Sequence, residues 1–190
     1  MAKDRTTPTR TAQIVSPALW LLIDGYNVLA PTAPPRNPGA NWLHQERMLL
    51  INRLAEHLDS ETRRRTCVVF DAANPPRDRP HRFTINDIDV VFAIEYPEAD
   101  DLLEELIAAH PTPKTLAVVS SDARVQTAAK RKRCRSFDSQ LWLDDLLDGN
   151  VRLAVDPAPT QPTTPNRIKP APPSESDVAD WMREFGFDEN

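Results

Sequence analysis

The sequence predicts an α/β protein, a three-layer α/β/α sandwich around a central, mainly parallel sheet of about five strands. Short apolar runs alternate along the chain with longer segments in which apolar residues recur at helical spacing. The apolar runs lack polar alternation, which is typical of strands buried on both faces of a parallel sheet. With 190 residues, 40% of them hydrophobic, the chain is long enough for one well-buried domain with tails and too short for two full domains.

The first predicted strand lies in the stretch 19–29, whose sequence is LWLLIDGYNVL. Its apolar run ends at Asp24. Gly25 is expected to free the backbone for a sharp turn, and the Asn27 side-chain carbonyl is expected to come back toward the Asp24 carboxylate. A carboxylate at the end of a buried strand is costly, and ligands of open α/β sheets bind at the carboxyl ends of the strands. We therefore expect Asp24 at the functional site.

The later elements continue the alternation of strand and helix. Further strands are predicted at 66–70, 88–94, 116–119 and 134–137. Helices are predicted at 42–58, from Pro97 through Ile107, at 123–132, and after a cap at Ser139. The connections are a Pro-rich loop at 30–41, a charged turn at 61–65 and a cationic polar loop at 72–87.

The predicted domain spans residues 18–153. A disordered tail at 1–17 precedes it, and a Pro-rich linker at 154–173 follows it. Residues 174–187 are predicted to form a short amphipathic helix, whose apolar stripe consists of Val178, Trp181, Met182 and Phe185. A helix this short is not stable alone in water, so it either docks on its own domain or binds a protein partner.

Composition excludes several classes of protein. A net charge of -5 excludes a protein that coats nucleic acid or membranes through overall positive charge. Cys67 and Cys134 lie in apolar runs, which favours buried thiols in a reducing compartment over a disulfide framework or a zinc site. Because the N-terminus has no apolar signal core and no stretch is long and apolar enough to cross a bilayer, we expect a cytoplasmic protein.

Four acids follow strands or begin helices at one edge of the predicted sheet. They are Asp24, Asp71, Asp100 and Asp122. Helical phase favours Asp100 over Asp101, because Asp100 shares a stripe with Leu103. Taken singly, Asp100 fits a helix N-terminus and Asp122 fits a cap. Capping does not explain the acids after the first two strands, so a shared site is the stronger hypothesis.

Converging carboxylates indicate a metal site. At about 4 Å, two carboxylates repel by roughly 4 kcal/mol at an effective dielectric constant near 20, so such a cluster requires protonation or a cation. Carboxylates and an Asn carbonyl suit Mg²⁺ or Mn²⁺, and the scarcity of nearby His and Cys argues against zinc. A metal held in this way hydrolyses phosphodiesters with activated water and without a nucleophilic side chain.

Two groups of cations are candidates for RNA binding. The first group lies in the loop after the second strand and consists of Arg77, Arg79 and Arg82. The second group lies near the end of the helix predicted at 123–132 and consists of Lys130, Arg131, Lys132, Arg133 and Arg135. A run of charges is also common on a merely solvated surface, and this alternative applies to the second group. Tyr26 could stack on a base or pack beside the turn.

Together these motifs resemble the NYN domain of the YacP-like branch, which is related to the PIN-domain nucleases. The matching segments are LIDGYN at 22–27, VVFDA at 68–72, EADD at 98–101 and SSD at 120–122, and the resemblance covers roughly residues 19–147. It implies a PIN/NYN-like fold and a metal-dependent endoribonuclease with Mg²⁺ or Mn²⁺, in a branch that has a ribosome-associated, mRNA-cleaving member. The matching site positions are Asp24, Asn27, Asp71, Asp100 and Asp122.

Two other functions are compatible with the sequence. A non-catalytic RNA or ribosome adaptor would keep the fold, although the complete set of acids argues against it. A phosphatase with an aspartyl nucleophile at Asp24 is less favoured, because that chemistry uses a second acid two residues further on and Tyr26 stands there.

Overall fold

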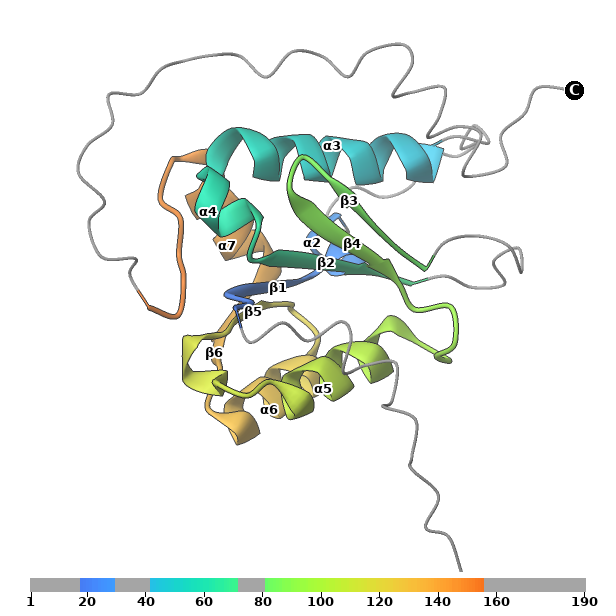
Figure 1. Ribbon diagram of the computed structural model, residues 1–190, viewed down its shortest axis with the longest axis vertical. Helices are drawn as coiled ribbons and strands as arrows, with labels where there is room; N and C mark the ends of the chain where they lie inside the picture. The colour runs from blue at the N-terminus through green and yellow to red at the C-terminus, as the bar shows by residue number, and fades with distance from the viewer. Residues whose placement is uncertain (1–17, 30–41, 72–80, 156–190) are drawn as a thin grey trace, which may run out of the picture.

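A computed structural model describes residues 18–29, 42–71 and 81–155 of the chain (Figure 1). The predicted N-terminal tail, the Pro-rich loop at 30–41, the C-terminal helix at 174–187 and nearly all of the linker before it lie outside these ranges, as do Arg77 and Arg79. Among the helices of the described ranges, none combines the length and the apolar character that spanning a bilayer requires.

Within the described ranges the centre of the fold is a six-stranded sheet with the order β3-β4-β2-β1-β5-β6. The strands are β1 (Leu21–Asp24), β2 (Thr66–Phe70), β3 (Arg82–Ile85), β4 (Ile88–Phe92), β5 (Ala117–Val119) and β6 (Arg135–Phe137). All neighbouring strands run parallel except β3 and β4, which are antiparallel. The predicted mainly parallel α/β architecture is confirmed.

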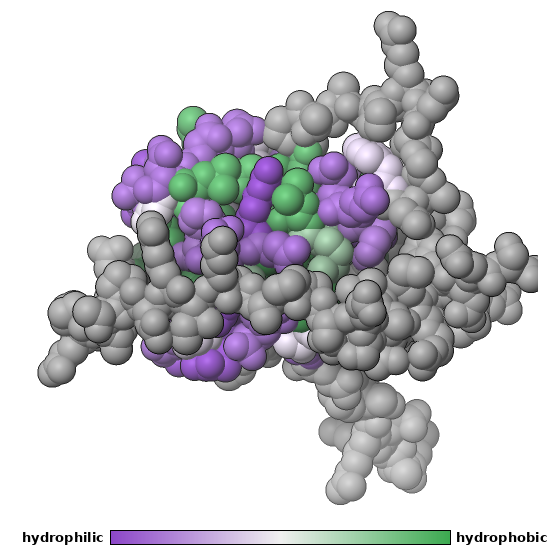
Figure 2. All heavy atoms as spheres, turned by 90° about the horizontal axis from the view of Figure 1, so that it is seen from above, coloured by the Kyte–Doolittle hydropathy of each residue, from purple (hydrophilic) through white to green (hydrophobic). Residues whose placement is uncertain are grey.

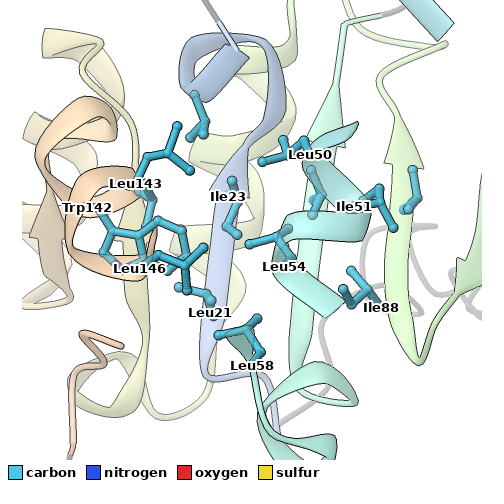
Figure 3. Close-up of a cluster of buried hydrophobic side chains, with 14 of the residues drawn as sticks. Leu21, Ile23, Leu50, Ile51, Leu54, Leu58, Ile88, Trp142, Leu143 and Leu146 are labelled. Atoms are coloured by element: carbon cyan, nitrogen blue, oxygen red, sulfur yellow. The ribbon is translucent and has the colours of Figure 1, made fainter. Parts of the chain in front are cut away.

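Helices cover both faces of the sheet. On one face lie α2 (Gly25–Leu29), α3 (Trp42–His57), α4 (Ser60–Arg63) and α7 (Ser139–Leu147), and on the other lie α5 (Ala99–Ala109) and α6 (Ala123–Lys132) (Figure 1). Alternate residues of β1 belong to two apolar cores, one on each face of the sheet. Leu21 and Ile23 pack against α3 and α7 (Figure 3), whereas Leu22 packs against α5 and α6.

The strand register defines two opposite edges of the sheet. Leu21 lies beside Thr66 and Ala117, and Ala117 lies beside Arg135. The residues that precede these four parallel strands therefore share one edge, which we call the amino edge. The residues that follow the same strands share the other, which we call the carboxyl edge.

The two helical layers differ in their outer surfaces. The exposed large apolar side chains of the described helices all belong to α3 and α7: Leu43, Leu49, Leu141 and Leu147. The view onto the α3 side shows apolar patches between polar ones (Figure 2). The outer surface of α6, in contrast, carries most of the exposed cations that the sequence singles out.

The largest departure from the prediction is strand β3, which lies inside the segment 72–87 that was predicted to be a loop. Asn86 and Asp87 adopt positive φ values of 51° and 67°, and two such residues form a tight hairpin turn that matches the twist of the flanking strands. The high charge of the segment conceals this hairpin in the sequence. Arg82 of β3 forms an ion pair with Asp89 of β4.

Two helix starts also differ from the prediction. The segment predicted as a charged turn at 61–65 contains the short helix α4, because the Asp59 carboxylate accepts hydrogen bonds from the backbone N–H groups of Glu61 and Thr62. Helix α7 is capped by Asp138 instead of Ser139. The Ser139 hydroxyl instead donates a hydrogen bond to Oδ1 of Asn27 in α2.

Gly25 is required for a different reason from the one that the sequence suggested. It begins helix α2 and does not adopt a positive φ. A Cβ atom at this position would lie 2.3 Å from Cε1 of Phe70, closer than carbon atoms approach in folded proteins. The absence of a side chain therefore lets the Phe70 ring pack directly against the turn.

We predict that Gly25→Ala destabilises the fold by about 1–3 kcal/mol through overpacking, as measured by urea unfolding. In a Phe70→Leu background the same substitution should cost markedly less, because the ring that it meets is gone. Gly149→Ala is the control: Gly149 has φ +81° and a Cβ added there would meet nothing within 4 Å, so its cost of about 1 kcal/mol is backbone strain and should not depend on Phe70. Equal costs for Gly25→Ala in both backgrounds would contradict the steric explanation.

Candidate functional site at the carboxyl edge

The Asp24 carboxylate lies at the centre of the carboxyl edge, where it is 6% exposed. Its Oδ2 accepts a hydrogen bond from the Ser120 hydroxyl at 2.9 Å, and its Oδ1 accepts one from the Asn27 backbone N–H at 3.2 Å. The register explains the first contact, because Ile23 lies beside Val119 and the next residues are Asp24 and Ser120. The Ser120 hydroxyl oxygen also accepts a hydrogen bond from the Asp122 backbone N–H.

Burial raises the pKa of Asp24 to about 6. The hydrogen bonds from Ser120 and Asn27 oppose this rise, whereas the neighbouring charges of Asp100 and Asp122 add to it. At neutral pH the carboxylate is thus ionised at a cost to the fold. The sequence-based expectation of a costly Asp at the end of β1 is explained by these surroundings.

Asp100 and Asp122 lie close enough to Asp24 to influence its charge. The pKa of Asp100, in the first turn of α5, is raised by burial and next by the charge of Asp122. Asp122 caps α6, because its Oδ1 accepts hydrogen bonds from the backbone N–H groups of Arg124 and Val125. Three carboxylates from three elements therefore form one electrostatic cluster.

Arg124 gives Asp101 an electrostatic environment different from that of its neighbour Asp100. Its guanidinium forms ion pairs with Asp101, Glu104 and Glu98 of the α5 region. Asp101 is thus paired with a cation in a bridge that joins α5 to α6. The effect of Arg124 on Asp100 is a weaker lowering of the pKa, outweighed by burial and by Asp122.

Asp71 lies at the same edge but further out. Val69 is the residue of β2 that lies beside Asp24, so Asp71 follows two residues beyond that level, and it is half-buried. In the described parts of the chain, no group of three or more His, Cys, Asp or Glu side chains is arranged to hold a metal ion. The four predicted acids share an edge without forming a closed set of ligands.

The Asn27 side chain does not turn toward Asp24 as the sequence suggested. Its Oδ1 accepts hydrogen bonds from the Ser121 backbone N–H at 2.8 Å and from the Ser139 hydroxyl at 3.0 Å. Because a backbone N–H can only donate, it fixes the orientation of the amide. Nδ2 is then the polar atom of this side chain that the network does not use, and it is a hydrogen-bond donor.

Sequence reasoning missed four polar residues that support the site: Ser120, Ser121, Asp138 and Ser139. The Ser121 hydroxyl donates to Oδ2 of Asp138 at 2.6 Å and accepts from the Ser139 backbone N–H at 3.0 Å. These contacts tie the ends of β1, β5 and β6 together. The signal in the sequence is that each of these residues is the first or second residue after a predicted strand.

Tyr26 packs beside the turn. Its ring meets that of Phe70 edge-on with 5.2 Å between centroids, and its hydroxyl accepts a hydrogen bond from Nη1 of Arg47 at 2.8 Å. The Arg47 guanidinium also lies over the Phe92 ring, 5.3 Å from its centroid. The packing alternative for Tyr26 therefore describes the structure.

Among the predicted RNA-binding cations that the structure describes, those of the second group do not gather around the acids. Arg82 lies in β3 beside Val91, in the row of residues that runs through Val69 to Asp24, and forms its ion pair with Asp89. Lys130, Arg131 and Lys132 form the last turn of α6, and Arg133 is its C-cap. Since the ten residues of α6 rise about 15 Å away from Asp122, this group lies at the amino edge. Arg135 begins β6 at the same edge.

Comparison with known proteins identifies relatives. The sequence profile of the YacP-like NYN domain matches residues 21–154. A curated relative, the uncharacterized protein YacP of Bacillus subtilis (strain 168), is 33% identical over 123 residues, which cover 62% of this chain and 71% of the relative. The crystal structure of Rae1 (YacP) from Bacillus subtilis is similar with a TM-score of 0.52 at 28% identity, over 68% of this chain and 74% of that one. The crystal structure of a mutant form of Rae1 has a TM-score of 0.51 at 27% identity, over 68% of this chain and 75% of that one.

We predict that Asp24→Asn stabilises the metal-free protein. Between pH 4 and 6 the folded wild type holds a proton on Asp24 that the unfolded chain releases, so the wild type loses stability as the pH rises through this window. The loss reaches about 3 kcal/mol above pH 6, since one pKa unit corresponds to about 1.4 kcal/mol. Asparagine avoids this loss and can still bond to both Ser120 and the Asn27 N–H.

Urea unfolding from pH 4 to pH 8 in the presence of a chelator measures this difference. The gain of Asp24→Asn over wild type should be near zero at pH 4, grow to pH 6 and stay level above it. Asp101→Asn is a matched control, because it removes an ion pair with Arg124 and should not stabilise the fold. A gain that does not change with pH would show that burial of the Asp24 charge is not its cause.

Proposed function

Because the chain belongs to the YacP-like NYN domain family, within the PIN-like nuclease superfamily, we propose that it is a metal-dependent endoribonuclease that hydrolyses RNA phosphodiester bonds. The observation that carries the proposal is the buried Asp24 carboxylate, whose pKa is raised to about 6 beside Asp100 and Asp122 at the carboxyl edge. A fold that needed only stability would gain from replacing this acid. The presence of Asp24 is explained if its negative charge serves the function, by binding a metal ion.

The donor set fits a divalent metal ion. Every candidate ligand is a carboxylate oxygen, which suits Mg²⁺ or Mn²⁺, and PIN-like nucleases generally use divalent metals. Asp24, Asp100 and Asp122, with Asp71 at the same edge, would hold the ion. When bound, it offsets the mutual repulsion of the acids and supplies activated water and charge stabilisation for phosphodiester hydrolysis.

The protein's own residues prepare this centre. Ser120 and the Asn27 backbone N–H stabilise the ionised form of Asp24 and fix the direction of its two oxygens. Arg124 pairs with Asp101, Glu104 and Glu98, and its positive charge offsets part of the repulsion that Glu98 and Asp101 add at Asp100. Asn27, held through its carbonyl oxygen, offers its Nδ2 group as a donor to a phosphate oxygen of the RNA.

The second candidate is an RNA-binding adaptor without catalysis. It is favoured by one observation: among the described residues the acids are not arranged as a ready metal-binding group. An adaptor would bind RNA equally well after Asp24→Asn and would not cleave it with any metal. The two functions are therefore distinguished by the same assay.

We predict that the wild type cleaves RNA with Mg²⁺ or Mn²⁺ and that a chelator abolishes cleavage. Asp24→Asn and Asp100→Asn should each lower kcat/KM by at least about 100-fold, as expected for loss of a group that stabilises charge in the transition state. Asp101→Asn is the matched control for Asp100→Asn and should change kcat/KM by less than about threefold. Gel analysis of single-stranded and structured RNA measures cleavage. Equal activity with metal, with chelator and in Asp24→Asn would refute the proposal.

We further predict that Asn27→Asp is inactive although it keeps the fold. Oδ1 of the new side chain can still accept from Ser121 and Ser139, but the donor becomes a negatively charged oxygen that repels phosphate. Ser139→Ala, which removes only one of the two contacts that hold the amide, should reduce kcat/KM by less. Retained or increased activity in Asn27→Asp would instead indicate that the residue is a metal ligand, because a carboxylate binds Mg²⁺ better than an amide.

A further inference from the structure

A group of cations occupies the α6–β6 end of the amino edge. The acids lie at the opposite edge of the sheet, the carboxyl edge. We call it the basic end, and it consists of Lys114, Lys130, Arg131, Lys132, Arg133 and Arg135. Lys114 precedes β5, Arg135 opens β6, and the other four end α6. All six residues are exposed. Arg135 lies beside Ala117 in the register, which places the start of β6 next to the start of β5.

The segments that carry the basic end contain no acids near it. Residues 106–121 contain no Asp or Glu, and residues 123–137 contain six cations and no acid. One of those six, Arg124, lies at the other end of α6, where it pairs with α5. The protein as a whole has a net charge of -5, so this local excess of positive charge is not a consequence of overall composition.

A purely structural explanation covers only part of the group. Cations in the last turn of a helix interact favourably with its dipole, and this accounts for Lys130, Arg131 and Lys132. It does not account for Lys114 or Arg135, which belong to other elements. Their gathering at one end of the sheet increases mutual repulsion, which a bound polyanion would relieve.

The chemistry of the basic end favours phosphates over bases. The nearby aromatic rings are covered by cations: Arg135 lies over Phe137, 5.7 Å from its centroid, and Arg65 lies over Trp20 at 4.0 Å. In each case a guanidinium occupies one face of the ring on which a base could otherwise stack. Lysine and arginine side chains without stacking partners recognise the nucleic-acid backbone independently of sequence.

We propose that the basic end is a second RNA-binding surface, which holds the phosphate backbone of the substrate at a distance from the cleaved bond. This inference rests on the proposed function, since it takes RNA as the substrate. The basic end lies about one length of α6, roughly 15 Å, from Asp122. An RNA must therefore be several nucleotides long to occupy both edges, and short RNA reaches only the acids.

The experiment uses the full chain and two variants that each remove two positive charges. Arg131→Gln/Lys132→Gln alters the basic end. Arg53→Gln/Arg152→Gln is the matched control on the α3–α7 side of the protein. Binding of a fluorescent 30-nucleotide RNA is measured at several salt concentrations. All proteins in the binding assay carry Asp24→Asn, so that the RNA is not cleaved during the measurement. Cleavage by otherwise wild-type protein is measured on the same RNA and on a tetranucleotide, and melting temperatures confirm folding.

We expect Arg131→Gln/Lys132→Gln to weaken binding of the long RNA by about tenfold and to reduce the slope of log affinity against log salt by about 1.4, or 0.7 for each lost contact with a single strand. Its kcat/KM should fall on the long RNA and stay unchanged on the tetranucleotide. The control should alter binding by less than about twofold. Salt-dependent binding through the basic end in a protein that cleaves no RNA would support this surface while refuting the proposed function.

Three results would overturn the proposal. The first is unchanged binding of the long RNA, or an equal loss in the control. The second is an equal loss of kcat/KM on both RNAs, which would place the cations at the cleavage site. The third is loss of binding to vesicles that contain phosphatidylserine while RNA binding is unchanged, which would identify the basic end as a membrane-binding surface.

Discussion

The candidate site depends on one constraint, the parallel register between β1 and β5. Because Ile23 lies beside Val119, the next residues on the two strands are Asp24 and Ser120, and the serine hydroxyl reaches the buried carboxylate. A shift of one residue would reverse the faces of the strand and would leave Asp24 buried without this donor. The two apolar cores on either side of β1 hold the register, so packing and electrostatics at the site are inseparable.

The acids oppose the stability that the core provides. Burial and the neighbouring charges of Asp100 and Asp122 make ionised Asp24 unfavourable, and Asp100 is raised in pKa for similar reasons. Polar contacts limit this cost without removing it. The chain places β1 at the centre of the sheet with all four residues buried, between two apolar cores. Charge is tolerated at the end of the strand because the rest of that strand is so well packed.

Most of the fold could be predicted because buried parallel strands have continuous apolar sequences. The exceptions depend on contacts that no local pattern reveals. Strand β3 is half-buried and lies in a charged, proline-containing segment, and Gly25 is explained only by the Phe70 ring. In the site, the acids could be found because each follows a strand or begins a helix. The partners of Asn27 could not, since Ser121 and Ser139 are 94 and 112 residues away in the sequence.

Helix α6 determines how far the second group of cations lies from the acids. In a parallel α/β fold each helix runs back across the sheet, so its first residue and its last turn lie at opposite edges. The helix dipole favours an acid at the first position and cations at the last, and α6 has Asp122 at one end and Lys130–Lys132 at the other. Asp122 and the cations of the last turn are thus separated by the length of the helix. Any RNA that contacts both must extend across the protein, and its length becomes part of what the protein recognises.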